Sequence, residues 1–188
     1  RQQRQPQRAA GRRALRLALL ALQSRSDDGA RAEAAFRAAD NMTEQVGALA
    51  CLLDIGRGQA ELATFEAQWQ NDRLVMDKWF SLQILYAAPD HTAEVTARLT
   101  THPLFDWKNP NRFRAVIGAV SANHAGFHHA SGATYRLVAD WLLRLDPLNP
   151  QTAARMSTAL ETWGRYDADR QALIRAELDR MLATPTLS

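Results

Sequence analysis

Residues 109–120 read NPNRFRAVIGAV, and this stretch decides the fold class of the chain. Pro110 suits the first turn of a helix, where a missing backbone N–H costs no hydrogen bond. After it, apolar residues recur at the three- and four-residue spacing of one helical face. These residues are Phe113, Val116, Ile117 and Val120. The stretch therefore predicts a helix that begins at Pro110 and buries this apolar face.

The same helical spacing continues on both sides of this stretch. Asn41 followed by Glu44 is typical of a helix start, because both side chains can bond to free backbone N–H groups. Residues 121–133 are mostly small and predict a connection. In the last helix, capped by Asp167, we expect Ile174, Leu178, Met181 and Leu182 to point inward. The other expected helices cover residues 12–23, 29–38, 41–56, 59–70, 71–86, 91–100, 138–145 and 150–163.

The order and spacing of these helices indicate the architecture. No window shows the alternation typical of a strand, and the connections are short. Two Asn-Pro helix openings, at residues 109–110 and 149–150, lie 40 residues apart and hint at hairpin repeats. We therefore expect an all-α fold of nine or ten helices, a right-handed superhelical stack of antiparallel helix pairs. We expect one domain over residues 1–188, with the first ten or so residues flexible.

Composition limits the function classes. The chain has 188 residues, of which 46% are hydrophobic and 23% charged, as in a globular protein. The single cysteine, Cys51, excludes an internal disulfide and a metal cage built of cysteines alone, and we expect it in the core. It suits a reducing compartment, so we expect a cytoplasmic protein. No apolar run is long enough to span a membrane. The first residue is Arg rather than Met, from which we expect a processed or cut chain.

The net charge of +3 points to no particular partner. Residues 1–16 carry six arginines and no acid, which is compatible with a tail that binds nucleic acid. No aromatic residues interleave these arginines, so no base-stacking surface is evident. We favour a solvated end that leads into a helix with an apolar stripe. This stripe consists of Leu15, Ala18, Leu19 and Leu22.

Catalytic motifs are missing from the chain. It contains no HExxH zinc motif, no phosphate-binding GxxxxGK, no dinucleotide-type GxGxxG and no GxSxG nucleophile elbow. His124, His128 and His129 lie within six residues of one another and could hold a metal ion. No acid lies between Asp106 and Asp140 to assist them, so we favour hydrogen bonds to the loop backbone. We expect no catalytic residue and no metal site in the chain.

Three arginines stand out by position. Arg112 and Arg114 lie at the opening of one helix, and Arg155 lies in the first turns after the second Asn-Pro. Positive side chains near a helix N-terminus do not complement the helix dipole. One explanation is that these arginines have a functional role, such as binding carboxylates. The other is an ion pair with an acid of a neighbouring helix.

Several strings occur together in an order that resembles a known family. They are ADNMTE at 39–44, LVMDKWFSLQ at 74–83, NPNRFRAVIGA at 109–119, FH at 127–128 before Gly132 and Tyr135, LNPQ at 148–151 and RYDADRQ at 165–171. In this spacing they resemble the C-terminal helical domain of the aminopeptidase N family of zinc-dependent gluzincin aminopeptidases. The resemblance covers the chain from about Arg13 to Met181.

This resemblance implies a function. The chain would be a non-catalytic domain of a metallopeptidase, a hydrolase that releases N-terminal amino acids from peptides. It would cap the upstream catalytic domain, which holds the zinc, and would line the internal substrate cavity and channel. The positions that match Arg114 and Arg155 are expected to face that interior, with Arg112 beside them. The partners would be the upstream catalytic domain and peptide substrates, without nucleic acid or membrane, and the isolated chain would be inactive.

Two other classes stay open. A free-standing α-solenoid that binds a peptide of another protein explains the helical pattern equally well, and a basic helical nucleic-acid binder is a third reading. As a domain of an aminopeptidase, the chain on its own is expected to expose an apolar docking face.

Overall fold

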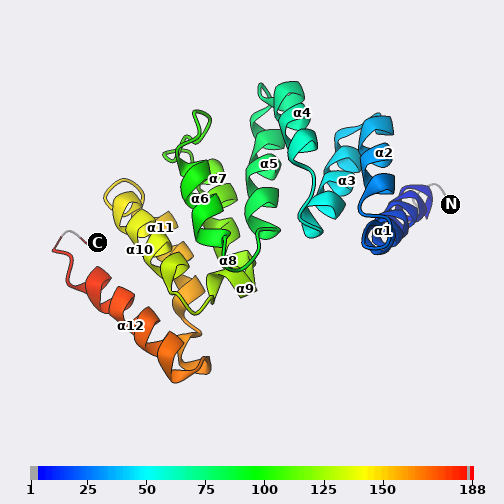
Figure 1. The fold of residues 1–188 in the computed structure, drawn as a ribbon. Helices are drawn as coiled ribbons and strands as arrows, with labels where there is room; N and C mark the ends of the chain where they lie inside the picture. The colour runs from blue at the N-terminus through cyan, green and yellow to red at the C-terminus, as the bar shows by residue number, and fades with distance from the viewer. Residues whose placement is uncertain (1–3, 186) are drawn as a thin grey trace. The chain divides into compact units, whose positions relative to one another are not determined.

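The structure is a computed structural model that describes residues 4–185 and 187–188, with side chains from residue 10 onward. It is all-helical, and no strand occurs among these residues, as the sequence predicts. The chain forms two compact units, the first ending at Leu82 and the second comprising Gln83–Ser188 (Figure 1). Our prediction of a single domain over residues 1–188 concerns how these units sit together and stays a prediction.

The first unit is built from successive antiparallel helices. They are α1 (Arg4–Ser24), α2 (Ala30–Ala38), α3 (Met42–Asp54), α4 (Gln59–Trp69) and most of α5 (Arg73–Leu85). Two of them begin at side-chain caps. Oδ1 of Asn41 accepts a hydrogen bond from the backbone N–H of Glu44 at 3.0 Å, as predicted, and Oδ1 of Asp72 accepts one from that of Val75 at 3.1 Å.

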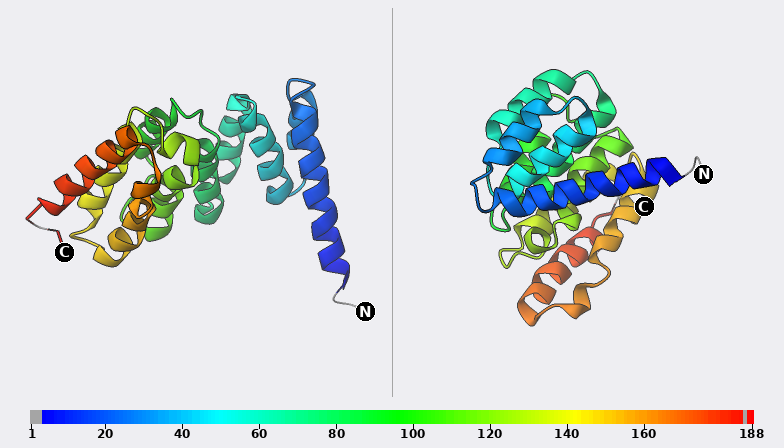
Figure 2. Two further views of the ribbon diagram at one scale, coloured as in Figure 1. Left: turned by 90° about the horizontal axis from the view of Figure 1, so that it is seen from below. Right: turned by 90° about the vertical axis from the view of Figure 1, so that its right-hand side faces the viewer.

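Helix α1 packs on α3 through one side only. Leu20 and Ala21 lie against a buried cluster of Ala32, Cys51 and Leu52. Leu17 lies so close to Gly47 that a Cβ there would stand 2.5 Å from its Cδ2. Helix α1 also begins at Arg4 rather than near residue 12, and it runs past α2 and α3 (Figure 2). The flexibility expected for the first residues falls partly outside the described residues.

The predicted apolar stripe of α1 lies on the other side. Leu15, Leu19 and Leu22 are 62%, 49% and 66% exposed. Leucines occur on both sides of α1, and only one side meets α2 and α3. Spacing alone could not distinguish the two sides, because each satisfies helical periodicity.

The second unit combines longer helices with single helical turns. They are α6 (Thr92–Thr100), α7 (Pro110–Phe113), η1 (Arg114–Gly118), α8 (Ala119–Ala122), α9 (His124–Phe127), α10 (Ala133–Leu145), α11 (Pro150–Ser157), η2 (Thr158–Leu160), η3 (Trp163–Arg165) and α12 (Ala168–Leu182). Among the described residues, no helix is both long enough and apolar enough to cross a membrane.

The predictions for three helices of this unit need correction. The helix that begins at Pro110 buries Phe113, Val116, Ile117 and Val120 as expected, but η1 within it is a π-helix. The helix after Pro150 ends at Ser157 rather than near residue 163, and 3₁₀ turns follow it. Leu182 is 74% exposed rather than inward, because the last turn of α12 extends beyond the buried Ile174 and Met181.

The connection predicted over residues 121–133 contains one helical turn, α9, held by side-chain bonds. Oδ1 of Asn123 accepts from the N–H of Gly126 at 3.0 Å. Nδ2 of the same side chain donates to the carbonyl oxygens of Ile84 and Ala87, each at 2.9 Å. Gly126 lies so close to Thr92 that a Cβ would stand 2.0 Å from Oγ1. These contacts fix α9 against α6 and the end of α5.

Candidate functional site

The side chain of Arg112 is buried inside the second unit. Its side chain is 5% exposed, and Nη1 donates to the carbonyl oxygen of Leu104 at 2.5 Å. The start of this helix is capped by Asn109, whose Oδ1 accepts from the N–H groups of Asn111 and Arg112. Arg112 therefore anchors the loop that precedes α7, and it does not present its charge to solvent.

Arg114, two residues later, is exposed and lies along its own helix. Nε donates to the carbonyl oxygen of Pro110 at 3.1 Å, and Nη2 donates to Oδ1 of Asn111 at 2.7 Å. No carboxylate among the described residues contacts it. The ion-pair explanation therefore does not account for Arg114, and its positive charge stays available.

Arg155 is exposed on α11, and its side chain has no hydrogen bond or ion pair among the described residues. Helix α11 lies against η1: a Cβ on Gly118 would stand 3.6 Å from Cε of Met156 and 3.7 Å from Cβ of Arg114. The structure thus places Arg114 and Arg155 on two elements in contact, whereas Arg112 is buried against Leu104. Neither exposed arginine has an acidic partner within the described part of the chain, so each can attract an anion.

The histidines of the predicted connection have other partners. Nδ1 of His128 lies 2.8 Å from the hydroxyl of Tyr135, and the His128 ring stacks on Tyr166 with centroids 3.9 Å apart. Nδ1 of His129 lies 3.0 Å from Oγ of Ser131. The ring partners thus include side-chain hydroxyls, and Nδ1 of His129 also accepts from the backbone N–H of Ser131 at 3.4 Å, a bond to the loop backbone of the kind expected. In the described part of the chain, no three His, Cys, Asp or Glu side chains are grouped to hold a metal ion.

Burial shifts the pKa values of His128 and Tyr135. It lowers the pKa of His128, and the nearby positive charges of His124 and Arg170 lower it further. Burial also raises the pKa of Tyr135 to about 12. At neutral pH the pair is therefore an uncharged imidazole beside an uncharged phenol. Nε of Arg170 donates to the carbonyl oxygen of His128 at 2.6 Å, which ties α12 to this loop.

Cys51 is 6% exposed, as predicted for a core thiol. Burial raises the pKa of its thiol, and Sγ lies 3.9 Å from the carbonyl oxygen of Leu17. The thiolate is therefore disfavoured, and Cys51 is a packing residue rather than a nucleophile.

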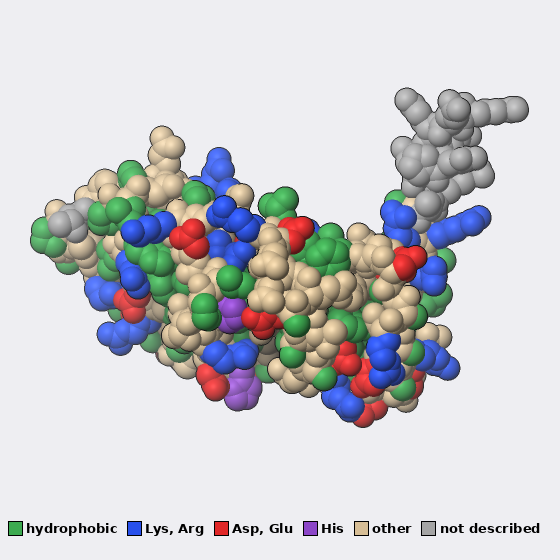
Figure 3. Space-filling model, turned by 90° about the horizontal axis from the view of Figure 1, so that it is seen from above, with side chains coloured by type: hydrophobic (Ala, Val, Ile, Leu, Met, Phe, Trp, Pro, Cys, Tyr) green, Lys and Arg blue, Asp and Glu red, His purple; other side chains and the backbone are tan. Residues whose placement is uncertain are grey.

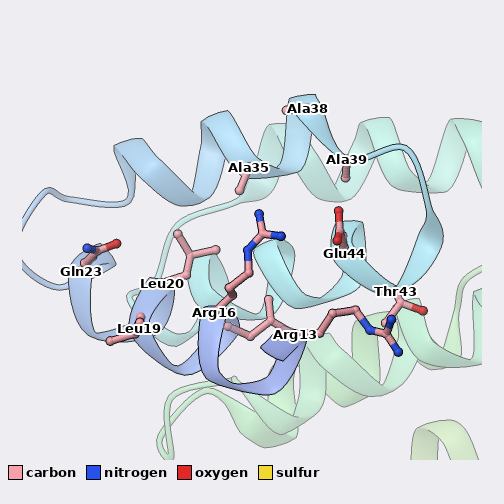
Figure 4. A pocket seen from close by; sticks show the side chains of 11 residues that line it. Arg13, Arg16, Leu19, Leu20, Gln23, Ala35, Ala38, Ala39, Thr43 and Glu44 are labelled. Atoms are coloured by element: carbon pink, nitrogen blue, oxygen red, sulfur yellow. The ribbon is translucent and has the colours of Figure 1, made fainter. Parts of the chain in front are cut away.

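Sequence reasoning missed one feature, a groove in the first unit. A cavity of about 410 Å³ lies between α1, α2 and the start of α3, and Figure 4 shows Arg13 and Arg16 extending over it. Leu19 and Leu20 supply its apolar lining, and Glu44 is its one acid. The arginine-rich start of the chain could have indicated this groove, but we interpreted it as a solvated end.

The chain is similar to proteins of one family. A family model described as "Domain of unknown function (DUF3458_C) ARM repeats" matches residues 1–188. Aminopeptidase N of Caulobacter vibrioides is 42% identical over 186 residues, covering 96% of this chain and 21% of that protein. Aminopeptidase N of Haemophilus influenzae is 41% identical over 157 residues, covering 81% of this chain and 18% of that protein.

A solved structure agrees with these relatives. The crystal structure of Legionella pneumophila aminopeptidase A in complex with aspartic acid matches with a TM-score of 0.79 and 32% identity. The match covers 86% of this chain and 19% of that one. The chain thus spans about a fifth of the length of the proteins it matches. It belongs to the DUF3458_C family of ARM-repeat domains, and its resemblance to a C-terminal domain of aminopeptidase N is confirmed.

Proposed function

We propose that this chain is the non-catalytic C-terminal domain of a zinc metalloaminopeptidase that releases N-terminal amino acids from peptides. The observation that carries the proposal is the coverage of the relatives. Proteins named aminopeptidase N match 81–96% of the chain, while the chain accounts for only 18–21% of their length. Most of such a protein, including its catalytic apparatus, lies outside the matched segment.

The chemistry of the chain is compatible with a catalytic site that lies in another domain. Among the described residues no three His, Cys, Asp or Glu side chains are grouped to hold a metal ion, and His128 and His129 contact the hydroxyls of Tyr135 and Ser131. In this proposal zinc belongs to the upstream catalytic domain, and no residue of this chain takes part in bond cleavage. We place the protein in the cytoplasm, on the ground of its single, buried cysteine.

The role of the chain is to cap the catalytic domain and line the internal substrate cavity. Arg114 and Arg155 are the residues that we assign to this lining, and their exposure and lack of acidic partners support the assignment. Two guanidinium groups on adjacent elements would attract the carboxylate end of a peptide. Arg112, predicted beside them, is buried and acts in this proposal as an anchor for the loop at Leu104.

An activity comparison tests the proposal. Residues 1–188 and the full-length product of the same gene are assayed with zinc on an alanyl chromogenic amide. An active full-length protein beside an inactive chain supports the proposal. Activity in the isolated chain, or an inactive full-length protein that binds peptides of other proteins, contradicts it and favours the interaction-module alternative.

A further inference from the structure

The guanidinium of Arg114 is held along one edge only. Nε donates to the carbonyl oxygen of Pro110 at 3.1 Å, and Nη2 donates to Oδ1 of Asn111 at 2.7 Å. A guanidinium carries its N–H donors in a fixed plane, and Nε and Nη2 lie along the same edge of that plane. Nη1 keeps both of its donors and Nη2 keeps one. No described residue therefore occupies the end of the group that Nη1 and Nη2 form together.

This free end suits a carboxylate. Two parallel N–H bonds from one guanidinium can reach the two oxygens of a carboxylate. Arg114 is exposed, and no carboxylate among the described residues contacts it. Basic side chains also lie close to one another over the second unit, in the left half of Figure 3, and a positive surface attracts anions. The arrangement favours a carboxylate over a neutral group at this position.

The local fold places Asn111 beside Arg114. Oδ1 of Asn109 accepts hydrogen bonds from the backbone N–H groups of Asn111 and Arg112, which fixes the first turn of α7. Residues three apart share a helical face, so Asn111 can reach Arg114. Arg114 is also the first residue of the π-helix η1, and π-helical turns are frequent at functional sites. Ordering a free arginine side chain during binding costs conformational entropy, and Asn111 has already restricted this one.

Arg155 provides a comparison within the same chain. It follows the second Asn-Pro as Arg114 follows the first, and Gln151 takes the place of Asn111 directly after the proline. Neither the guanidinium of Arg155 nor the side-chain amide of Gln151 has a hydrogen bond to another described residue. The guanidinium of Arg155 is therefore unrestrained, whereas that of Arg114 is held in one orientation.

We propose, on the basis of the proposed function above, that Asn111 is a positioning residue for Arg114. It holds the guanidinium so that Nη1 and Nη2 receive the C-terminal carboxylate of a peptide as two parallel hydrogen bonds. Arg155 contributes positive charge without a fixed geometry. The two arginines thus divide the recognition of the carboxylate between orientation and attraction.

The KM of the full-length protein tests the positioning role. Asn111→Ala is assayed on a peptide with a free C-terminal carboxylate and on its C-terminal amide. We expect KM to rise about threefold or more for the free peptide, with KM for the amide and both kcat values unchanged. Unchanged KM for the free peptide, or an equal rise for both peptides, overturns the proposal, because a purely structural role would affect both alike.

Two further variants sharpen this test. Asn111→Gln keeps an amide oxygen at the same helical position and should return KM for the free peptide to within about twofold of the native value. Gln151→Ala is the matched control, because it removes an exposed amide next to the other Asn-Pro without changing the contacts of an arginine. It should change KM for neither peptide. A rise in Gln151→Ala equal to that in Asn111→Ala overturns the proposal.

Lysine substitutions test the paired hydrogen bonds. Lysine keeps the positive charge but presents a compact ammonium in place of the planar fork. Arg114→Lys should raise KM for the free peptide about as much as Arg114→Ala, by about five- to tenfold. Arg155→Lys should stay within about twofold of the native value, because attraction needs only the charge. Tolerance of lysine at both positions overturns the proposal.

Arg114→Ala separates this role from the proposed function. A rise in KM for the free peptide in Arg114→Ala, beside native values in Asn111→Ala and Arg114→Lys, leaves the cavity lining in place and overturns the positioning role alone. An unchanged KM in Arg114→Ala overturns both the lining by Arg114 and its positioning by Asn111.

Discussion

Nη2 of Arg114 donates to Oδ1 of Asn111 at 2.7 Å, so this exposed guanidinium is held along its own helix rather than by an acid. Arg112, two residues before it, is buried against the carbonyl oxygen of Leu104. Two arginines at the same helix opening therefore have opposite environments. One contributes to folding, and the other leaves its charge available.

This contrast predicts different effects on stability. Arg112→Ala is expected to lower the free energy of unfolding by about 2–3 kcal/mol, because Leu104 loses a buried charged donor. Arg114→Ala and Arg155→Ala are exposed changes and should cost less than about 0.5 kcal/mol each. Urea denaturation of the three variants of the 188-residue chain measures the difference. Equal losses at Arg112 and Arg114 would show that the buried contact contributes nothing.

Asn123 acts as both donor and acceptor, and its substitutions should show this. Asn123→Ala removes two bonds to the carbonyl oxygens of Ile84 and Ala87 and the cap of α9. We expect a loss of about 2–3 kcal/mol. Asn123→Asp should be at least as destabilising, because a carboxylate would then face those carbonyl oxygens.

The matched control is Asn109→Asp at the start of α7. There the side-chain oxygen only accepts from backbone N–H groups, which a carboxylate also does. This variant should stay within about 0.5 kcal/mol of the native stability. A well-tolerated Asn123→Asp would mean that the amide donor bonds are unimportant.

Residue 126 must be glycine because its backbone lies too close to Thr92 to leave room for a Cβ atom. Gly126→Ala places a Cβ 2.0 Å from Oγ1 of Thr92, so α9 must move. We expect thermal or urea unfolding to report a loss of about 2–3 kcal/mol. Gly118→Ala is the control, because its nearest neighbours lie at 3.6 Å and its φ of −66° suits alanine. That change should be neutral or stabilise by up to about 1 kcal/mol. Similar effects at both positions would refute the steric account.

The His128 cluster predicts a pH dependence. Burial lowers the pKa of His128 in the folded state, while in the unfolded chain the pKa is about 6.5. The unfolded state therefore binds more protons in this window, so the free energy of unfolding falls as pH drops from neutrality through the folded pKa. Below that pKa the loss is complete.

His128→Gln should flatten this part of the pH profile of unfolding measured in urea. His91→Gln, on the exposed start of α6, should leave the His128 contribution unchanged. A profile that keeps its full slope in His128→Gln would assign the dependence to other groups.

Local signals in the sequence predicted much of the fold. Pro110 and the caps at Asn41 and Asp167 act within one turn, so their effects can be seen without tertiary contacts. Helix α9 was missed because its bonds join Asn123 to Ile84 and Ala87, nearly forty residues away in the sequence. The π-helix η1 was missed because the buried face of residues 113–120 keeps ordinary helical spacing.

The candidate site was predicted only in part. Arg112 and Arg114 were both selected because they lie near the start of a helix. Their different exposure depends on tertiary packing, which buries Arg112 and leaves Arg114 exposed. The groove on α1 depends on which of two leucine faces meets α3. Contacts between helices, such as Leu17 on Gly47, determine which leucine face is buried. The periodicity of α1 alone does not distinguish the two faces.

Kinetics of the full-length protein test our proposal that Arg114 and Arg155 line the substrate cavity of an aminopeptidase. Arg114→Ala and Arg155→Ala are made in the full-length protein, with the exposed Arg136→Ala as control. KM is then compared for a peptide with a free C-terminal carboxylate and for its C-terminal amide. The account predicts a rise of about five- to tenfold in KM for the free peptide alone, equivalent to about 1–1.4 kcal/mol. Unchanged KM values for both peptides in both variants would contradict it.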